Sequence, residues 1–319
     1  MSAKCECVNV RKVVIVGCGF VGSASAFALM QSGLFSEMVL IDVDKDRAEG
    51  EAMDISHGAS FAGPMKIYAG GYEDVGDAAI IVITAGANQK PNETRLDLVQ
   101  KNAKIMADVV TQIKEQEYKG ILLIVSNPVD IMTQVAMEVS GFPEHRVFGS
   151  GTVLDSARLR YHLGQHLGVD SRSVHAFVIG EHGDSEIAAW SSANVSGVPL
   201  NSFCEMRGHY NHEGNTESIE EQVKNSAYEI IAKKDATYYG IAMVVKRICQ
   251  AIVRDEKSIF PISLRMHGEY ALEDVVLSMP AIVGARGIET TIPISLDEKE
   301  VSRLHESAEM LRETRKEIR

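Results

Sequence analysis

Residues 13–22 read Val-Val-Ile-Val-Gly-Cys-Gly-Phe-Val-Gly, a continuous apolar run followed by a G-x-G-x-x-G turn. The run is typical of a buried strand, and Phe20 to Gln31 has the composition of a buried helix. In this strand–turn–helix context Gly17 permits the tight turn, Gly19 lets a pyrophosphate approach the backbone and Gly22 allows close helix–strand packing. The stretch predicts a dinucleotide site at a helix N-terminus.

An acidic residue further along the chain indicates which dinucleotide is bound. Asp42 follows the second apolar strand, Val39 to Ile41, twenty residues after Gly22. A carboxylate at this position accepts hydrogen bonds from both ribose hydroxyls and repels a 2′-phosphate. The residues therefore predict NAD rather than NADP.

The rest of the chain extends this pattern into a fold class. Further apolar runs at 80–83 and 121–125 predict strands, and apolar residues recurring between 99 and 113 predict an amphipathic helix between them. This alternation predicts a doubly wound parallel (Rossmann) sheet. After Gly149 helical signals are mixed with short strand-like runs, which predicts an α+β catalytic domain. We therefore expect an NAD-binding domain at 1–149, with a mobile loop at 86–97, and a substrate domain at 150–319.

Composition restricts the function further. The 319 residues are 45% hydrophobic and 24% charged, which is typical of a globular protein, and the net charge of −12 disfavours nucleic acid and anionic membranes as partners. No apolar run approaches the ~18 residues of a membrane span. The polar N-terminus and five scattered cysteines favour the reducing cytoplasm. Cys5 and Cys7 lack a second pair for zinc, so we expect no metal. The polar stretch 207–221 predicts a surface loop that leads into a helix.

Three segments contain the residue types that hydride transfer to a 2-keto acid requires. They are the loop 86–96 with Arg95, the pair Asp155 and Arg158, and the glycine-flanked His182. Singly, each has an ordinary explanation as a solvated loop cation, a surface ion pair or a surface histidine. Together they supply a bidentate cation for the carboxylate, a proton donor with a carboxylate partner, and a second cation to polarise the carbonyl.

The combined motifs resemble the bacterial-type NAD-dependent L-lactate dehydrogenases of the lactate/malate dehydrogenase family. The resemblance spans Val13 to about Arg315, with these motifs: GCGFVG (17–22), ANQKPNETRL (87–96), VSNPVD (125–130), GSGTVLDSAR (149–158), GEHGDS (180–185) and ATYYG (236–240). It implies reversible hydride transfer between NADH and pyruvate, giving L-lactate and NAD. A malate or broader 2-hydroxy-acid dehydrogenase is the alternative. A redox-sensing protein without turnover would need no such catalytic set.

The resemblance also implies roles for individual residues. His182 is the proton donor and acceptor, Asp155 is its partner, and Arg95 polarises the carbonyl. The implied substrate-binding residues are Gln89, Arg95, Asn127, Arg158 and Thr237. The implied NAD contacts are Gly17, Gly19, Phe20, Val21, Gly22, Asp42, Thr84, Ala85, Gly86, Ser126 and Asn127. By analogy, the Asn127–Pro128 bond is a candidate cis peptide. Asp235 departs from the family, which often has glycine there.

Substrate choice depends on the charge of the loop. Pyruvate has one carboxylate, which Arg158 balances, whereas oxaloacetate adds a second at the methyl end. A malate enzyme places an arginine on the loop to meet that group, and neutral Gln89 would leave it desolvated and unpaired. Lys90 is an adjacent cation, but the neighbouring Pro91 favours a solvent-facing position for it.

Two further residues suggest regulation. Arg160 and His175 match positions that bind fructose 1,6-bisphosphate at a subunit interface in allosteric bacterial relatives, and a basic pair suits a phosphate. The alternative is an ordinary surface arginine and a histidine at the edge of the core. The family implies a homotetramer, and an interface site needs at least a dimer.

Overall fold

The computed structural model describes residues 8–87 and 94–318. Residues 1–7, 88–93 and 319 lie outside this description, as does the side chain of Arg95. Cys5, Cys7 and half of the loop predicted at 86–97, including Gln89, therefore lie outside the described residues.

A parallel sheet occupies the first half of the chain, as its apolar runs predict. Its strands lie in the order β3-β2-β1-β4-β5-β6, which is characteristic of dinucleotide-binding doubly wound folds. Val14 of β1 pairs with Val39 on one side and Ile81 on the other. The strands are β1 (Asn9–Val16), β2 (Glu37–Ile41), β3 (Lys66–Ala69), β4 (Ala78–Ile83), β5 (Ile121–Ile124) and β6 (Val147–Gly149).

The second half of the chain continues the same sheet with antiparallel strands. Ser263 of β12 lies opposite Gly149 of β6, and β13 and β14 follow as a meander. This confirms the expected fold class, although the sequence did not indicate one continuous sheet. The strands are β12 (Ser258–His267), β13 (Glu273–Gly284) and β14 (Gly287–Thr291). Shorter strands form two small sheets: β7 (Val174–His175), β8 (Val178–Ile179), β9 (Ile187–Ala188), β10 (Asn194–Val195) and β11 (Val198–Pro199).

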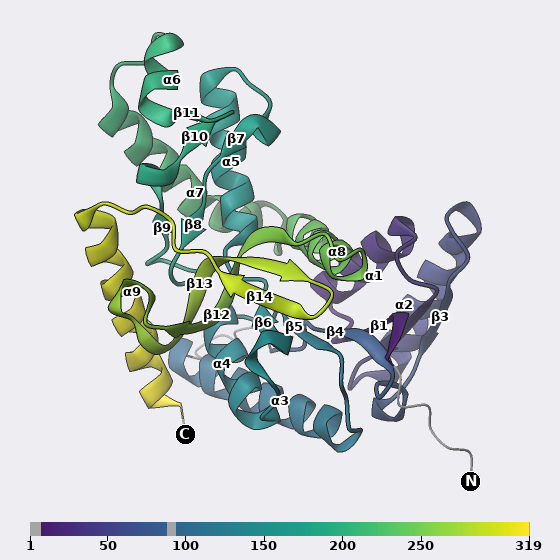
Figure 1. The fold of residues 1–319 in the computed structure, drawn as a ribbon. Helices are drawn as coiled ribbons and strands as arrows, with labels where there is room; N and C mark the ends of the chain where they lie inside the picture. Colours follow the sequence, from purple (N-terminus) through teal and green to yellow (C-terminus); the bar gives the residue numbers. More distant parts are fainter. Residues whose placement is uncertain (1–7, 88–93, 319) are drawn as a thin grey trace.

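Helices cover both faces of the large sheet (Figure 1). Helices α3 and α4 pack together below it in this view, whereas α1 and α8 pack together at the opposite face. The core strands are therefore buried on both sides, with Val13, Ile80 and Leu122 fully inaccessible. The helices are α1 (Phe20–Ser32), α2 (Lys45–Gly58), α3 (Arg95–Glu115), α4 (Val129–Ser140), α5 (Val153–Leu167), α6 (Leu200–Met206), α7 (His212–Lys234), α8 (Tyr239–Val253) and α9 (Glu298–Glu317).

One element corrects the sequence interpretation. The helix expected after the loop at 207–221 begins earlier than predicted, because α7 starts at His212, where Asn211 caps it by accepting from the N–H of Gly214. The helix buries only Ile219 and Val223, so its sequence shows little apolar periodicity. Within residues 8–87 and 94–318, no helix has both the length and the hydrophobicity needed to cross a lipid bilayer.

Candidate active site

The glycine turn lies at the carboxyl edge of the parallel sheet and fits a pyrophosphate. Gly17 has a φ of 101°, and a Cβ there would lie 2.6 Å from the backbone nitrogen of Ala85. A Cβ on Gly22 would overlap the carbonyl oxygen of Gly17, so the glycine permits the close approach of α1. The space beside Gly19 is open to 4 Å. This opening at the helix N-terminus leaves room for a phosphate to approach the backbone.

Asp42 fixes the shape of the turn. Its carboxylate accepts the N–H of Cys18 at 2.6 Å and the N–H of Asp44 at 2.9 Å. Among the ten residues that line a groove next to the turn, four are acidic, namely Asp44, Asp46, Glu51 and Asp54, and one, Arg47, is basic. A 2′-phosphate would meet these carboxylates, which supports the prediction of NAD over NADP.

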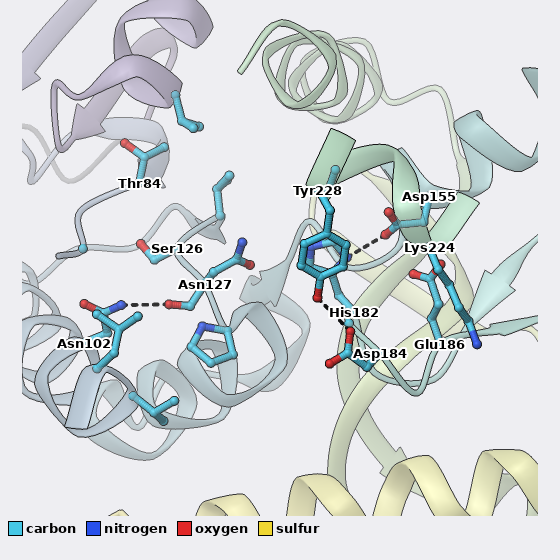
Figure 2. Close-up of a pocket in the computed structure, with 18 of the residues that line it drawn as sticks. Thr84, Asn102, Ser126, Asn127, Asp155, His182, Asp184, Glu186, Lys224 and Tyr228 are labelled. Atoms are coloured by element: carbon cyan, nitrogen blue, oxygen red, sulfur yellow. Dashed lines mark hydrogen bonds and ion pairs between the residues drawn. The ribbon is translucent and has the colours of Figure 1, made fainter. Parts of the chain in front are cut away.

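A second cavity, of about 500 Å³, contains many of the residues predicted from the sequence. Figure 2 shows Thr84, Ser126 and Asn127 on one side and Asp155 and His182 on the other. The predicted residues that line it are Val21, Thr84, Gly86, Ser126, Asn127, Asp155, Arg158 and His182. Thr237 is not among the described lining residues and lies between α7 and α8. The Asn127–Pro128 bond is cis, as expected.

An imidazole–carboxylate–guanidinium chain lies within this cavity. The Nδ1 of His182 lies 2.6 Å from one carboxylate oxygen of Asp155, and the Nη1 of Arg158 donates to the other at 2.7 Å. Asp155 and Arg158 share a face in the first turns of α5 because they are three residues apart. The Asp155 side chain is only 3% exposed. The arrangement fixes the ring orientation of His182 and keeps Nε2 available for a proton transfer.

The surrounding charges set the protonation states of this chain. Burial alone would lower the pKa of His182, but the charge and hydrogen bond of Asp155 outweigh it and raise the pKa to about 9. Burial opposes ionisation of Asp155, yet His182 and Arg158 hold its pKa below the usual range. At neutral pH the pair is therefore an imidazolium beside a carboxylate. The imidazolium of His182 can then donate a proton to a substrate.

Sequence reasoning did not find several residues that complete the cavity. Asn102 of α3 accepts the N–H of Ala87 at 2.8 Å and donates to the carbonyl of Asn127 at 3.0 Å. Its signal was a polar side chain on the apolar face of an amphipathic helix. Lys224 and Tyr228 of α7 also line the cavity.

Glu186 is a second buried carboxyl group beside the pair. It is 4% exposed, and burial followed by the charge of Asp155 raises its pKa to about 8. Its carboxyl group, with the ligating atoms of Asp155 and His182, falls within a 4.8 Å cluster of metal-ligand types. Asp155 already bonds to both an imidazole and a guanidinium, so its two oxygens are engaged.

The two residues predicted for regulation lie away from this cavity. Arg160 of α5 donates through Nε to the carbonyl of Ser156 at 3.2 Å, and burial lowers the pKa of its guanidinium. His175 is exposed on β7, opposite Asn194 of β10. Neither residue lines the cavity that contains His182.

The dinucleotide-type sheet and the adjoining acid–base pair define an NAD-dependent oxidoreductase. The family model of the lactate/malate dehydrogenase NAD binding domain matches residues 11–149, and that of the alpha/beta C-terminal domain matches residues 152–319. The chain therefore belongs to the lactate/malate dehydrogenase family, and NAD is its cofactor.

Individual relatives cover nearly the whole chain. It is 49% identical to an L-lactate dehydrogenase of Acetivibrio thermocellus, across 95% of this chain and 96% of that protein. It is 48% identical to L-lactate dehydrogenase 1 of Clostridium acetobutylicum, across 95% and 97%. Among solved structures, a lactate dehydrogenase from a Medee basin deep-sea metagenome library has a TM-score of 0.94 at 47% identity, covering 96% of this chain and 98% of that one. The ligand-bound minor L-lactate dehydrogenase of Enterococcus mundtii also has a TM-score of 0.94, at 43% identity, covering 97% and 98%.

Proposed function

We propose that this protein is an NAD-dependent L-lactate dehydrogenase that interconverts pyruvate and L-lactate. The observation that carries the proposal is the His182–Asp155 pair, with Arg158 beside it, in a cavity also lined by Val21 of the glycine turn. The names of the similar proteins support the same activity.

Three polar side chains of the cavity have roles in the proposed reaction. His182 transfers its proton to the carbonyl oxygen of pyruvate as the alkoxide forms, and in the reverse direction accepts it from lactate. Asp155 stabilises the imidazolium. Arg158 binds the substrate carboxylate, because its planar guanidinium keeps further N–H donors besides the one used by Asp155. NADH, when bound, supplies the hydride.

The remaining assignments extend the proposal beyond these contacts. Arg95 polarises the carbonyl when the loop 86–97 closes and excludes water. Gln89 and Thr237 contact the substrate, and the NAD contacts are those predicted from the sequence. The division into a cofactor domain at 1–149 and a substrate domain at 150–319 is supported by the change from parallel to antiparallel strands after β6.

The alternative substrate is oxaloacetate, and a parallel assay distinguishes the two. We expect kcat/KM for pyruvate to exceed that for oxaloacetate by at least about a hundredfold, which corresponds to about 2.7 kcal/mol at the transition state. NADH oxidation should be followed with each substrate for the wild type and for Lys90→Gln. Equal or better turnover of oxaloacetate would contradict the lactate assignment. If the ratio of kcat/KM for pyruvate to that for oxaloacetate differs between Lys90→Gln and the wild type, then the cation at position 90, rather than Gln89, selects the substrate.

We also propose that the protein is a homotetramer activated by fructose 1,6-bisphosphate bound near Arg160 and His175. The exposure of His175 and the basic character of both residues support a phosphate site. Titrating the bisphosphate at low pyruvate should lower the apparent KM, and Arg160→Gln/His175→Gln should abolish that response. An unchanged KM in the wild type would refute activation. Light scattering measures the oligomeric state separately.

A further inference from the structure

A buried amide side chain joins the two chain segments that form one wall of the cavity. Asn102 of α3 is 5% exposed. Its Oδ1 accepts the backbone N–H of Ala87 at 2.8 Å, and its Nδ2 donates to the backbone carbonyl of Asn127 at 3.0 Å (Figure 2). Ala87 follows β4 and Asn127 follows β5, so one side chain connects the segments that leave two neighbouring strands.

The two partners determine the orientation of this amide. A backbone N–H only donates and a backbone carbonyl only accepts, so the oxygen of Asn102 faces Ala87 and its nitrogen faces Asn127. The position therefore needs an acceptor and a donor on one short side chain. An apolar side chain of the same size makes neither bond, and an ionised carboxylate makes only the bond to Ala87.

The helix that carries Asn102 does not explain an asparagine at this position. The residue lies on the buried face of α3, between the buried apolar residues Val99 and Met106. An amide buried among such residues is unfavourable unless its hydrogen bonds are made, and asparagine is a poorer helix former than leucine. The two contacts outside α3 therefore account for the residue better than the stability of α3 does.

Ser126 provides a separate link between the same two segments. Its hydroxyl donates to the carbonyl of Ala85 at 2.6 Å. Along the chain this link lies nearer the ends of β4 and β5, so Asn102 is the side chain that holds Ala87 and Asn127 themselves. All of these residues except Ala85 line the cavity. Loss of the Asn102 bonds would thus release the part of the wall that lies further from the sheet.

We propose that Asn102 is a positioning residue for the reaction, which holds Asn127 in place against the bound substrate. The proposal rests on the proposed function, in which Asn127 contacts the substrate and His182 moves the proton from the other side of the cavity. Asn102 acts through the main chain of Asn127. A displacement of about 1 Å at such a contact can lower the rate by about a hundredfold.

Asn102→Leu removes both bonds and keeps most of the buried volume. We expect kcat for pyruvate reduction to fall about tenfold to a hundredfold, with the affinity for NADH changed less than about threefold. Steady-state kinetics and fluorescence titration with NADH measure the two quantities. The proposal is overturned if kcat stays within twofold of the wild type, or if only the affinity for NADH changes.

Val110→Ala is the matched control for a loss of stability alone. Val110 is fully buried in the same helix and is not among the described residues that line the cavity. Its truncation should lower the melting temperature while kcat stays within about twofold of the wild type. If Val110→Ala loses as much kcat as Asn102→Leu at the same melting temperature, the effect is structural and the proposal fails.

Asn102→Asp tests the bond to Asn127 by itself. A protonated carboxyl group accepts from Ala87 and donates to Asn127 as the amide does, whereas the ionised form cannot donate. Burial should raise the pKa of the introduced carboxyl group above the usual range of aspartate. Figure 2 shows Asp155 and His182 on the opposite side of the cavity from Asn102. The described charged residues that line the cavity are Asp155, Arg158, His182, Asp184, Glu186 and Lys224.

The readout for this variant is the ratio of its kcat to that of the wild type at each pH, which cancels the titration of groups common to both proteins. We expect the ratio to rise about tenfold as pH falls through the pKa of the introduced group. A ratio near one at every pH would mean that the group stays protonated and replaces the amide, which also supports the proposal. A ratio that stays low at every pH would contradict it.

Amide hydrogen exchange tests the two bonds without turnover. In the presence of NADH, the N–H of Ala87 should exchange at least about tenfold faster in Asn102→Leu than in the wild type, and Val110→Ala should leave it unchanged. This result supports the contact even if the wild type fails to reduce pyruvate, which would refute the proposed function alone. Unchanged exchange at Ala87 in Asn102→Leu refutes the role of Asn102.

Discussion

At the scale of single residues, the protonation of His182 determines which direction of the reaction the free enzyme supports. Reduction of pyruvate needs the imidazolium, which is present below a pKa of about 9 and is lost above it. We therefore expect kcat/KM for pyruvate to be flat at neutral pH and to fall about tenfold per pH unit above the pKa. The kcat/KM for lactate oxidation should instead rise with pH up to about the same pKa, because that direction needs the neutral imidazole.

Asp155→Asn tests the origin of that pKa. The variant removes the negative charge that does most to outweigh burial, so the alkaline limit should move to lower pH, and kcat should fall by about a hundredfold or more. The pH dependence of pyruvate reduction in both proteins measures this. An unmoved limit would show that another group titrates there.

Residue chemistry was only partly predictable from sequence. The spacing of Asp155 and Arg158 placed both on one helical face, and the structure brings them together with His182. Asn102 and Glu186 could not be assigned, because their roles depend on which segments meet across the fold rather than on their sequence neighbours.

At the scale of elements, the C-terminus of α7 shows the structural effect of Asp235, a position where the family often has glycine. Asp235 adopts the left-handed conformation, with φ 68°, that glycine usually takes after a helix, and its N–H closes the helix on the carbonyl of Ile231. Within residues 8–87 and 94–318, no side-chain hydrogen bond of Asp235 offsets the strain. We expect Asp235→Gly to raise the free energy of unfolding by about 0.5–1 kcal/mol.

Asp255 provides the matched control for this prediction. It also has a positive φ, of 50°, but its carboxylate accepts the N–H of Ala285 at 2.9 Å. Asp255→Gly relieves the strain and loses that bond, so it should not stabilise the protein. Thermal unfolding of the two variants side by side measures the difference. Equal stabilisation of both would contradict the prediction that Asp235→Gly stabilises the protein because it relieves strain without losing a side-chain hydrogen bond.

Strands could be predicted from the sequence where both faces of the sheet are buried. Continuous apolar runs identified β1, β4 and β5, whereas β12 contains Pro261, which argues against a central strand. In the structure Pro261 lies opposite Pro280 of β13, so the two missing N–H donors fall at one position of the ladder. The two strands are consecutive in the chain, but no local pattern in either one indicates that the two prolines face each other.

At the scale of the whole molecule, the shared sheet joins the two halves into one cooperative unit. A core of buried residues runs from Val13 to Leu311 across both halves. We expect a single thermal transition of the full chain, and we expect residues 150–319 alone to remain unfolded. Calorimetry of the full chain and circular dichroism of the fragment test this. Two resolved transitions would mean that the halves are independent.

The continuous sheet also imposes an order on synthesis. The ribosome completes β6 on the order of a hundred residues before β12, the strand that pairs with it near Gly149. At ordinary translation rates the nascent chain therefore presents an unpaired sheet edge for on the order of ten seconds. Such an edge is a template for pairing with other chains. The antiparallel strands thus cover this edge only late in synthesis, and we expect the nascent protein to depend on chaperones most while these strands are still being made.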